Sequence, residues 1–331
     1  MRLSPRLIVI AALTVLVGGS AAGCSGNFGA AYAIGKTKRP SAATASGPSG
    51  ASVPSGTRPQ VNTAVVPSIK VAGVPRGVLA KAGILADAAT GQVLWAKNAN
   101  SERPIASITK VMTAYLVLKS GDLNRMIKVP KAVLGYVWKY GASSDSLLPG
   151  EVLTSRELLD GLLLESGADA AYTLASVYGP GLGAFVAKMN ATARELGMTH
   201  THFASPDGLP YPTEFSTYST PSDLLILGEA AMKFPVFRSV VDQRFYSLPK
   251  GQGHAAHWWG NSNALIGSYQ GAIGIKTGFT DGAGHCLLFE AVRDGRPLIG
   301  VVLGSPLTGP GAAAQDAARI LDWGFALKRS A

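Results

Sequence analysis

The sequence predicts one α/β domain, in which a five-stranded antiparallel sheet is combined with a helical subdomain. Two observations favour this class. Strand patterns lie at both ends of the folded part of the chain, and helical patterns with apolar residues every three or four positions fill the middle. Strands at both ends with helices between them favour one sheet covered by terminal helices. About 250 residues follow a low-complexity N-terminal part, which is enough for one sizeable core.

The five strands are expected in two groups. The first two flank an Ala-Thr-Gly turn and have the pattern of a hairpin. The last two meet at Asp294-Gly295, a dipeptide typical of hairpin turns. The strand ranges are 82–87, 92–97, 272–276, 285–293 and 297–303.

Helical periodicity accounts for the middle of the chain and for its end. The helix at the C-terminal end is expected to cover the sheet, and the others to form the helical subdomain. The helix ranges are 108–119, 156–164, 168–177, 184–196, 222–232 and 312–327.

The N-terminus has the pattern of an export signal. Two arginines precede the apolar run 7–17, which is too short to span a bilayer and is followed by small residues. We expect residues 1–24 to be a lipoprotein-like signal peptide, with Cys24 lipidated and holding the protein at the membrane. An ordinary cleavage site at Ala31-Tyr32-Ala33 is the alternative, in which Cys24 is part of a discarded leader.

Residues 25–76 are rich in Ser, Ala, Gly and Pro and poor in large apolar side chains. Such a segment cannot bury enough surface to offset its chain entropy, so we expect a disordered tether. A tether of this kind lets an anchored domain reach a substrate away from the membrane, although a segment without a role is the alternative. Residues 77–331 are expected to form the folded domain.

Charge argues against a nucleic-acid partner. The formal net charge is +10, but residues 1–81 hold nine basic and no acidic residues. The remaining 21 basic and 20 acidic residues leave the rest of the chain near +1. A folded part this close to neutral, without a basic face, has little to hold a phosphate backbone.

The two cysteines cannot build a disulfide framework. Cys286 lies in an apolar run, which favours a buried structural thiol over a reactive one. The histidines do not predict a metal site, since His254 and His257 lack a third ligand. We expect no metal and no cofactor.

Three short motifs follow one another along the chain: Ser107-Ile108-Thr109-Lys110, Ser166-Gly167-Ala168 and Lys276-Thr277-Gly278. The first, S-x-x-K, is weak evidence alone because chance supplies it about once in such a chain. A second copy at 247–250 contains a proline and is discarded. The first copy leads a helical pattern, which places Ser107 near the first turn of a helix.

This placement suits an activated serine. A hydroxyl is a poor nucleophile until a base removes its proton, and Lys110 lies one helical turn after Ser107. To act as that base near neutral pH, Lys110 needs a pKa lowered from about 10.4 to near 7, which burial and a second cation can provide. Lys276 is the candidate for that cation. An extended peptide pairing along the strand of Lys276 would bring its terminal carboxylate to Lys276 and Thr277.

The three motifs, in this order, resemble the active-site set of the penicillin-recognising serine acyl-transferases. Within that group the chain is similar to the serine-type D-alanyl-D-alanine carboxypeptidases, the low-molecular-mass penicillin-binding proteins of the S11 peptidase type. The resemblance covers about residues 82–327. Its other segments are residues 104–114, 148–151, 158–164, 201–203, 206–209, 261–263, 274–280 and 283–284.

The resemblance implies a β-lactamase/transpeptidase-like fold and a set of roles. Ser107 would be the nucleophile and Lys110 the general base, while Ser166 would relay a proton to the leaving amine. A helix N-cap is the alternative role for Ser166. Lys276, Thr277 and Gly278 would bind the substrate, and the backbone amides of Ser107 and Phe279 would form the oxyanion hole.

The implied substrate is a peptidoglycan stem peptide that ends in D-Ala-D-Ala, with β-lactams as covalent inhibitors. We therefore expect an exported enzyme of the cell envelope, with residues 77–331 as its catalytic domain. Two alternatives are a β-lactamase or esterase on the same fold, and a catalytically weakened peptidoglycan-binding protein.

Two positions depart from the family pattern. Ala168 stands where the family has Asn, and its methyl group cannot bond the substrate amide or the Lys110 amine. Asp169 is not an obvious replacement, because one step along a helix turns a side chain by about 100°. Ser205 stands where the family often has Asn. Loss of a polar contact to the transition state lowers activity or alters the substrate range.

Overall fold

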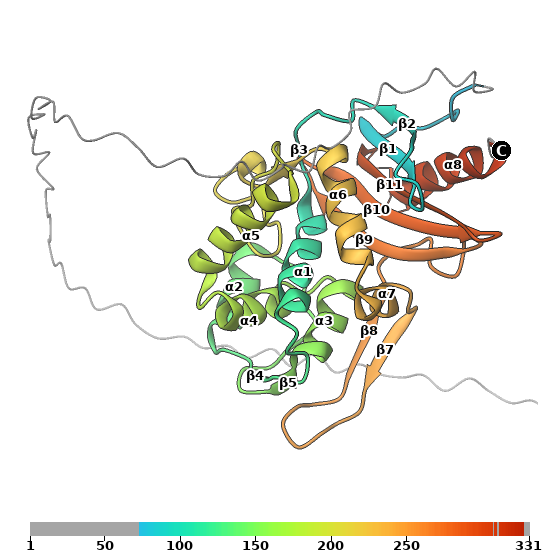
Figure 1. Cartoon of the computed structure of the whole chain (residues 1–331). Helices are drawn as coiled ribbons and strands as arrows, with labels where there is room; N and C mark the ends of the chain where they lie inside the picture. Colours follow the sequence, from blue (N-terminus) through green and yellow to red (C-terminus); the bar gives the residue numbers. More distant parts are fainter. Residues whose placement is uncertain (1–72, 307, 310, 328–331) are drawn as a thin grey trace, which may run out of the picture. The chain divides into compact units, whose positions relative to one another are not determined.

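The computed structural model describes residues 73–306, 308–309 and 311–327. Its main sheet has five antiparallel strands in the order β2-β1-β11-β10-β9 (Figure 1). The predicted α/β class and its five-stranded antiparallel sheet are confirmed. The strands are β1 (Ala82–Asp87), β2 (Val93–Lys97), β9 (Ala272–Thr280), β10 (Gly284–Arg293) and β11 (Arg296–Ser305).

The predicted turn between the last two strands is confirmed. Asp294 and Gly295 have φ angles of 49° and 71°, the left-handed conformation that a tight hairpin turn requires. The first strand of the domain, β1, pairs with β11 on one side and β2 on the other. The two ends of the folded chain therefore share one sheet, and β9 is left as an edge strand.

Helices form most of the rest of the domain. The helices between the sheet's two strand groups are α1 (Lys110–Ser120), α2 (Ala132–Tyr140), α3 (Ser155–Leu164), α4 (Ala168–Tyr178), α5 (Leu182–Leu196), α6 (Pro221–Met232) and α7 (Pro235–Val241). The last helix is α8 (Ala312–Ala326). Short helical turns are η1 (Ala106–Thr109) and η2 (Glu214–Ser216).

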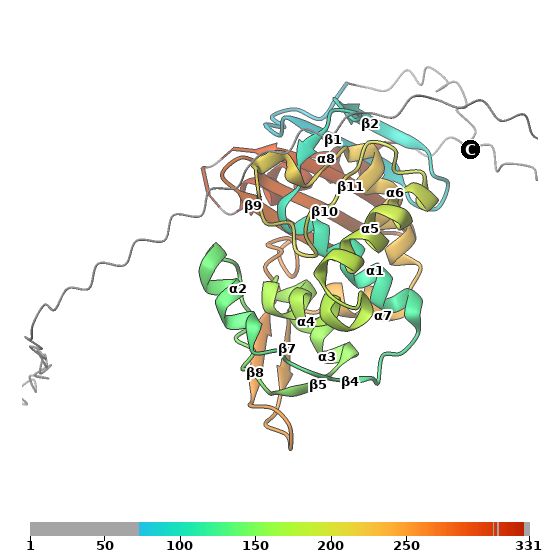
Figure 2. The same ribbon diagram turned by 90° about the vertical axis from the view of Figure 1, so that its left-hand side faces the viewer.

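The sheet is covered by helices on both faces (Figures 1 and 2). Leu298 and Ile299 are neighbours in β11 and therefore point to opposite faces. A Cβ at Gly324 of α8 would lie 2.9 Å from Leu298, and one at Gly228 of α6 would lie 3.3 Å from Ile299. The helices α8 and α6 thus cover opposite faces, and the two glycines allow their close approach.

Helix α1 carries the first motif into the core of the helical part. Its residues Val111, Met112, Ala114 and Val117 are fully buried, and α3, α4, α5 and α6 pack around it. The start of the neighbouring helix α3 is fixed by a capping box in the local sequence. The side chain of Thr154 accepts a hydrogen bond from Glu157 N, and the Glu157 carboxylate accepts one from Thr154 N.

Several elements were not predicted from the sequence. Helices α2 and α7 were missed, because α2 is apolar on exposed as well as buried positions and α7 is only seven residues long. The hairpin of β7 (Phe245–Leu248) and β8 (His257–Gly260) has a long loop without a tight-turn signal and packs on α3. The remaining short strands are β3 (Arg103–Pro104), β4 (Met126–Lys128), β5 (Val152–Thr154) and β6 (Tyr218–Ser219).

The predicted signal peptide, its lipidated Cys24 and residues 25–72 of the predicted tether lie outside the described residues. The described chain begins at Gly73, whose carbonyl accepts a hydrogen bond from Trp323 Nε1. In the described part of the chain, no helix combines the length and the apolar character that crossing a membrane requires.

Candidate active site

Ser107 and Lys110 meet at the junction of η1 and α1. Lys110 Nζ lies 2.9 Å from Ser107 Oγ and donates a second hydrogen bond, of 3.1 Å, to the carbonyl of Asp207. The lysine side chain is buried, with 2% of its surface exposed. The expected contact across one helical turn is therefore present, and the amine is held on two sides.

The backbone around the site adopts left-handed conformations at two residues other than glycine. Ala106, directly before Ser107, has φ of 47°, and Ser166 of the second motif has φ of 73°. Such conformations cost on the order of 1–3 kcal/mol each and persist where the surrounding packing enforces them. Both serines are thus presented from backbone that the fold holds in place.

Burial shifts the protonation of two lysines at the site. Desolvation lowers the pKa of Lys110. Desolvation, followed by the charge of Lys110, lowers the pKa of Lys276 to about 7. The charges of Asp207, Asp145 and Asp169 oppose the shift at Lys110, but desolvation outweighs them. Burial therefore favours a neutral amine at Lys110, as an activating base requires.

The lowered pKa of Lys276 predicts how stability depends on pH. The unfolded chain holds a proton on this amine up to its ordinary pKa of 10.5, whereas the folded protein loses it near 7. Stability should therefore rise with pH between these values, by at most about 1.4 kcal/mol per pH unit from this group. We expect the Tm to rise from pH 7 to pH 9, and Lys276→Met to show a smaller rise. An equal rise in both proteins would contradict this account.

Strand β9 brings the third motif against the nucleophile. A Cβ at Gly278 would lie 2.7 Å from the carbonyl oxygen of Ile105 and 3.2 Å from Ser107 N, so only glycine permits this approach. The strand continues to Thr280, beyond the predicted end at residue 276. This extension places Phe279 opposite His285 of β10, and Ser107 and Phe279 both line one pocket.

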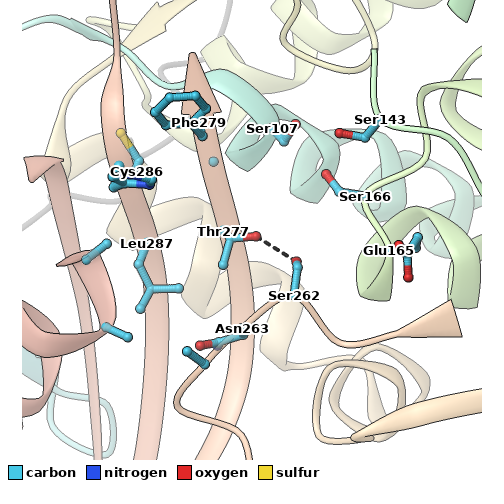
Figure 3. A pocket seen from close by; sticks show the side chains of 15 residues that line it. Ser107, Ser143, Glu165, Ser166, Ser262, Asn263, Thr277, Phe279, Cys286 and Leu287 are labelled. Carbon is cyan, nitrogen blue, oxygen red and sulfur yellow. Dashed lines mark hydrogen bonds between the residues drawn. The ribbon is translucent and has the colours of Figure 1, made fainter. Parts of the chain in front are cut away.

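The pocket gathers polar groups from separate elements (Figure 3). Thr277 Oγ1 lies 2.8 Å from Ser262 Oγ and 3.4 Å from Lys276 Nζ. Ser143 and Ser166 line the same pocket, across from the strand of Thr277. The arrangement offers a nucleophile at one end and a group of donors for an anion at the other.

Ser166 is not a helix cap. The N-cap of α4 is Gly167, and no side chain caps that helix. The Ser166 side chain is 7% exposed and lines the pocket beside Ser107. This position leaves its hydroxyl available to a bound molecule.

Four residues at or near the site had no role assigned from the sequence: Ser143, Asp145, Asp207 and Ser262. Asp207 and Ser262 stand in segments that resemble the family, but their contacts depend on the folded geometry. Asp145 packs under the second motif, where a Cβ at Gly167 would lie 1.9 Å from its carboxylate. Burial raises the pKa of Asp145.

Cys286 is buried, as predicted, and bonds backbone carbonyls. Burial raises the pKa of its thiol to about 11, so at neutral pH it is protonated and a poor nucleophile. His257 contacts Glu151 at 3.2 Å inside the fold. In the part of the chain that the structure describes, no group of three His, Cys, Asp or Glu side chains is placed to hold a metal ion.

Comparison with known proteins identifies the family. The sequence profile of peptidase S11, D-alanyl-D-alanine carboxypeptidase, matches residues 69–306. The chain belongs to the peptidase S11 family. The match covers the sheet, the helical part and all three motifs, and it confirms the resemblance found in the sequence.

Comparisons with individual proteins support this family assignment. The D-alanyl-D-alanine carboxypeptidase of Streptomyces sp. (strain K15) is 41% identical over 262 residues, which are 76% of this chain and 88% of the relative. DacB2 of Mycobacterium tuberculosis is 39% identical over 253 residues, covering 76% of this chain and 84% of the relative. The crystal structure of the Streptomyces K15 DD-transpeptidase superposes with a TM-score of 0.71 at 38% identity, covering 78% of this chain and all of that one.

The two residues that depart from the S11 pattern, Ala168 and Ser205, have different surroundings. Ala168 is 1% exposed at the start of α4. Asp169 does not replace the missing Asn, because its carboxylate accepts hydrogen bonds from Ser144 Oγ and from the backbone of Asp145 and Leu147. The hydroxyl of Ser205 bonds the Asp207 carboxylate and Gly208 N within its own turn.

Proposed function

We propose that the protein is an exported serine D,D-carboxypeptidase that removes the terminal D-alanine from peptidoglycan stem peptides. The observation that carries this proposal is the 2.9 Å contact between the buried Lys110 amine and the Ser107 hydroxyl. Membership of the S11 family supports the substrate class, since its curated relatives are named D-alanyl-D-alanine carboxypeptidases.

In the first half-reaction, the stem peptide pairs along the free edge of β9, with its carboxylate at Lys276 and Thr277. Ser107 Oγ attacks the carbonyl carbon of the D-Ala-D-Ala bond while its proton passes to Lys110. The backbone amides of Ser107 and Phe279 stabilise the oxyanion. The carbon–nitrogen bond then breaks, and Ser166 relays the proton to the leaving amine of D-alanine.

The second half-reaction frees the enzyme. Water attacks the acyl carbon, the ester bond to Ser107 breaks, and a proton returns to Ser107 Oγ through Lys110. A β-lactam enters the same sequence, because opening its ring forms an ester on Ser107 that resembles the acyl-enzyme. The β-lactam is therefore a covalent inhibitor wherever this ester resists water.

Export and anchoring belong to the same proposal. A substrate in the cell wall requires an enzyme outside the cytoplasm, and the N-terminal sequence has the pattern of a signal peptide ending at Cys24. A lipid on Cys24 would hold the enzyme at the membrane, and residues 25–76 would let its catalytic domain, residues 77–331, reach the wall. Mass analysis of Cys24 in the membrane fraction tests this step.

A catalytically weakened peptidoglycan-binding protein is the second candidate, and Ala168 is the observation that favours it. If the absent Asn limits catalysis, Ala168→Asn should raise the rate of D-alanine release from a D-Ala-D-Ala peptide about tenfold or more, since one polar contact to a transition state is worth a few kcal/mol. An enzymatic assay of released D-alanine measures this rate. An unchanged rate in a folded variant would show that position 168 does not limit activity.

A further inference from the structure

One charged residue in the pocket has no part in the reaction described above. Glu165 precedes Ser166, its side chain is exposed, and it lines the pocket of Ser107 and Thr277 (Figure 3). Its carboxylate oxygen Oε2 accepts a hydrogen bond of 3.0 Å from Gly260 N. Among the described residues, neither a salt bridge nor a bond to its second oxygen is found. The carboxylate is therefore fixed by one oxygen and open at the other.

The backbone places Glu165 at the anion-binding end of the pocket. Ser262 N donates a hydrogen bond of 3.0 Å to the carbonyl of Leu164, and Ser262 Oγ contacts Thr277. Glu165 therefore stands beside the segment of Ser262 and across the pocket from the strand of Thr277 (Figure 3). An acid here repels a second carboxylate and attracts a cation.

An aromatic side chain adjoins this acid. Trp258 of β8 is 64% exposed, and its ring stacks on Phe245 with 5.8 Å between ring centroids. A Cβ at Gly260 would lie 3.1 Å from the indole of Trp258 and 3.9 Å from Glu165 Oε2. The indole and the carboxylate thus lie next to one point beside Gly260, and both attract an ammonium group.

We propose that Glu165 and Trp258 form a specificity subsite for a protonated primary amine of the peptidoglycan. This inference rests on the proposed function and adds a substrate class to it. The amine has two sources with the same chemistry: the side chain of the donor stem peptide, or a second amine of an acceptor that takes the acyl group. In the acceptor case, a neutral amine attacks the acyl carbon, the ester bond to Ser107 breaks, and the amine's proton returns to Ser107 Oγ through Lys110.

The experiment compares matched substrates on the full chain. The donors are α-N-acetyl-L-Lys-D-Ala-D-Ala, with a free side-chain amine, and its diacetylated form, which is neutral there. The acceptors are Gly-Lys and Gly-norleucine, supplied with the neutral donor and followed by the mass of the transfer product. We expect the protein to prefer the amine-bearing member of one pair at least about fivefold, because an ion pair and a cation–π contact each give a modest gain.

Charge removal should abolish that preference. Glu165→Gln keeps an oxygen for Gly260 N but removes the charge, so we expect the ratio of rates between the two members of a pair to fall to about one. Glu165→Asp keeps the charge and should keep part of the preference. Trp258→Leu should lower the preference without removing it. Glu195→Gln is the matched control, since Glu195 is an exposed acid that pairs with Lys119 on the helical surface.

The outcomes separate this inference from the proposed function. No preference in either pair overturns the subsite. The subsite is also overturned if Glu165→Gln lowers the rate equally for both donors and shifts the pH profile of that rate. Glu165 would then act through its charge on Lys276 instead. A protein that releases no D-alanine and forms no penicillin adduct contradicts the proposed function. In that case calorimetric binding of the donor pair still tests the subsite, with a fivefold difference supporting it and equal binding overturning it.

Discussion

Replacing Ser107 by alanine should abolish D-alanine release, with a fall on the order of 10⁴-fold or more in kcat. The reason is that Ser107→Ala removes the atom that forms the acyl-enzyme, while its backbone amide and the rest of the pocket remain. Release of D-alanine from a D-Ala-D-Ala peptide measures the effect. The Tm should change little, because the substitution removes only one small hydroxyl at the surface of the pocket.

The chain supplies a matched control for this variant. Ser247 begins the second S-x-x-K copy, but it lies exposed in strand β7 and outside the pocket. Ser247→Ala should therefore keep the activity of the parent protein. Equal losses in the two variants, or substantial release by Ser107→Ala, would show that Ser107 is not the nucleophile.

Replacing Lys110 should give the second largest loss. Lys110→Gln removes the amine that lies 2.9 Å from Ser107 Oγ, and positioned proton transfer is worth about 10²- to 10⁴-fold. Lys110→Arg should not restore the rate at any pH between 6 and 9, because a guanidinium stays protonated and cannot accept the proton. The rate of acylation by a chromogenic β-lactam, followed against pH, measures both variants.

Lys119 provides the comparison on the same helix. It is exposed and pairs with Glu195 at 3.2 Å, away from the pocket. Lys119→Gln should acylate at the parental rate. Recovery of acylation by Lys110→Arg would contradict the role of a neutral amine at position 110, because charge alone would then suffice.

The fold was largely accessible from the sequence because its main elements follow clear periods. Strands 82–87 and 285–293 are apolar runs bounded by turn residues, and the helix at 156–164 begins with a Thr154–Glu157 capping box. Helix α2 was missed because its exposed positions include Leu134 and Trp138, which hide the amphipathic period. Strand β9 was expected too short because glycine at positions 274 and 278 weakens a strand pattern.

Only the part of the site that depends on local spacing could be predicted from the sequence. Ser107 and Lys110 are neighbours on one helical turn, so their contact follows from local spacing. The contacts of Lys110 with the Asp207 carbonyl, and of Thr277 with Ser262, join segments far apart in the chain and depend on packing. Asp145 and Glu165 gave no motif signal, because a single acid becomes informative only when its surroundings are known.

The mass of the intact full-length protein after incubation with benzylpenicillin tests the central claim most directly. The account predicts a stable gain of one penicillin per chain, which peptide mapping places on Ser107 and which Ser107→Ala does not acquire. Rapid loss of penicillin without an adduct would contradict the carboxypeptidase and point to a β-lactamase. If no adduct forms and no penicillin is lost, the result would contradict an active acylation site and point to a non-catalytic wall protein.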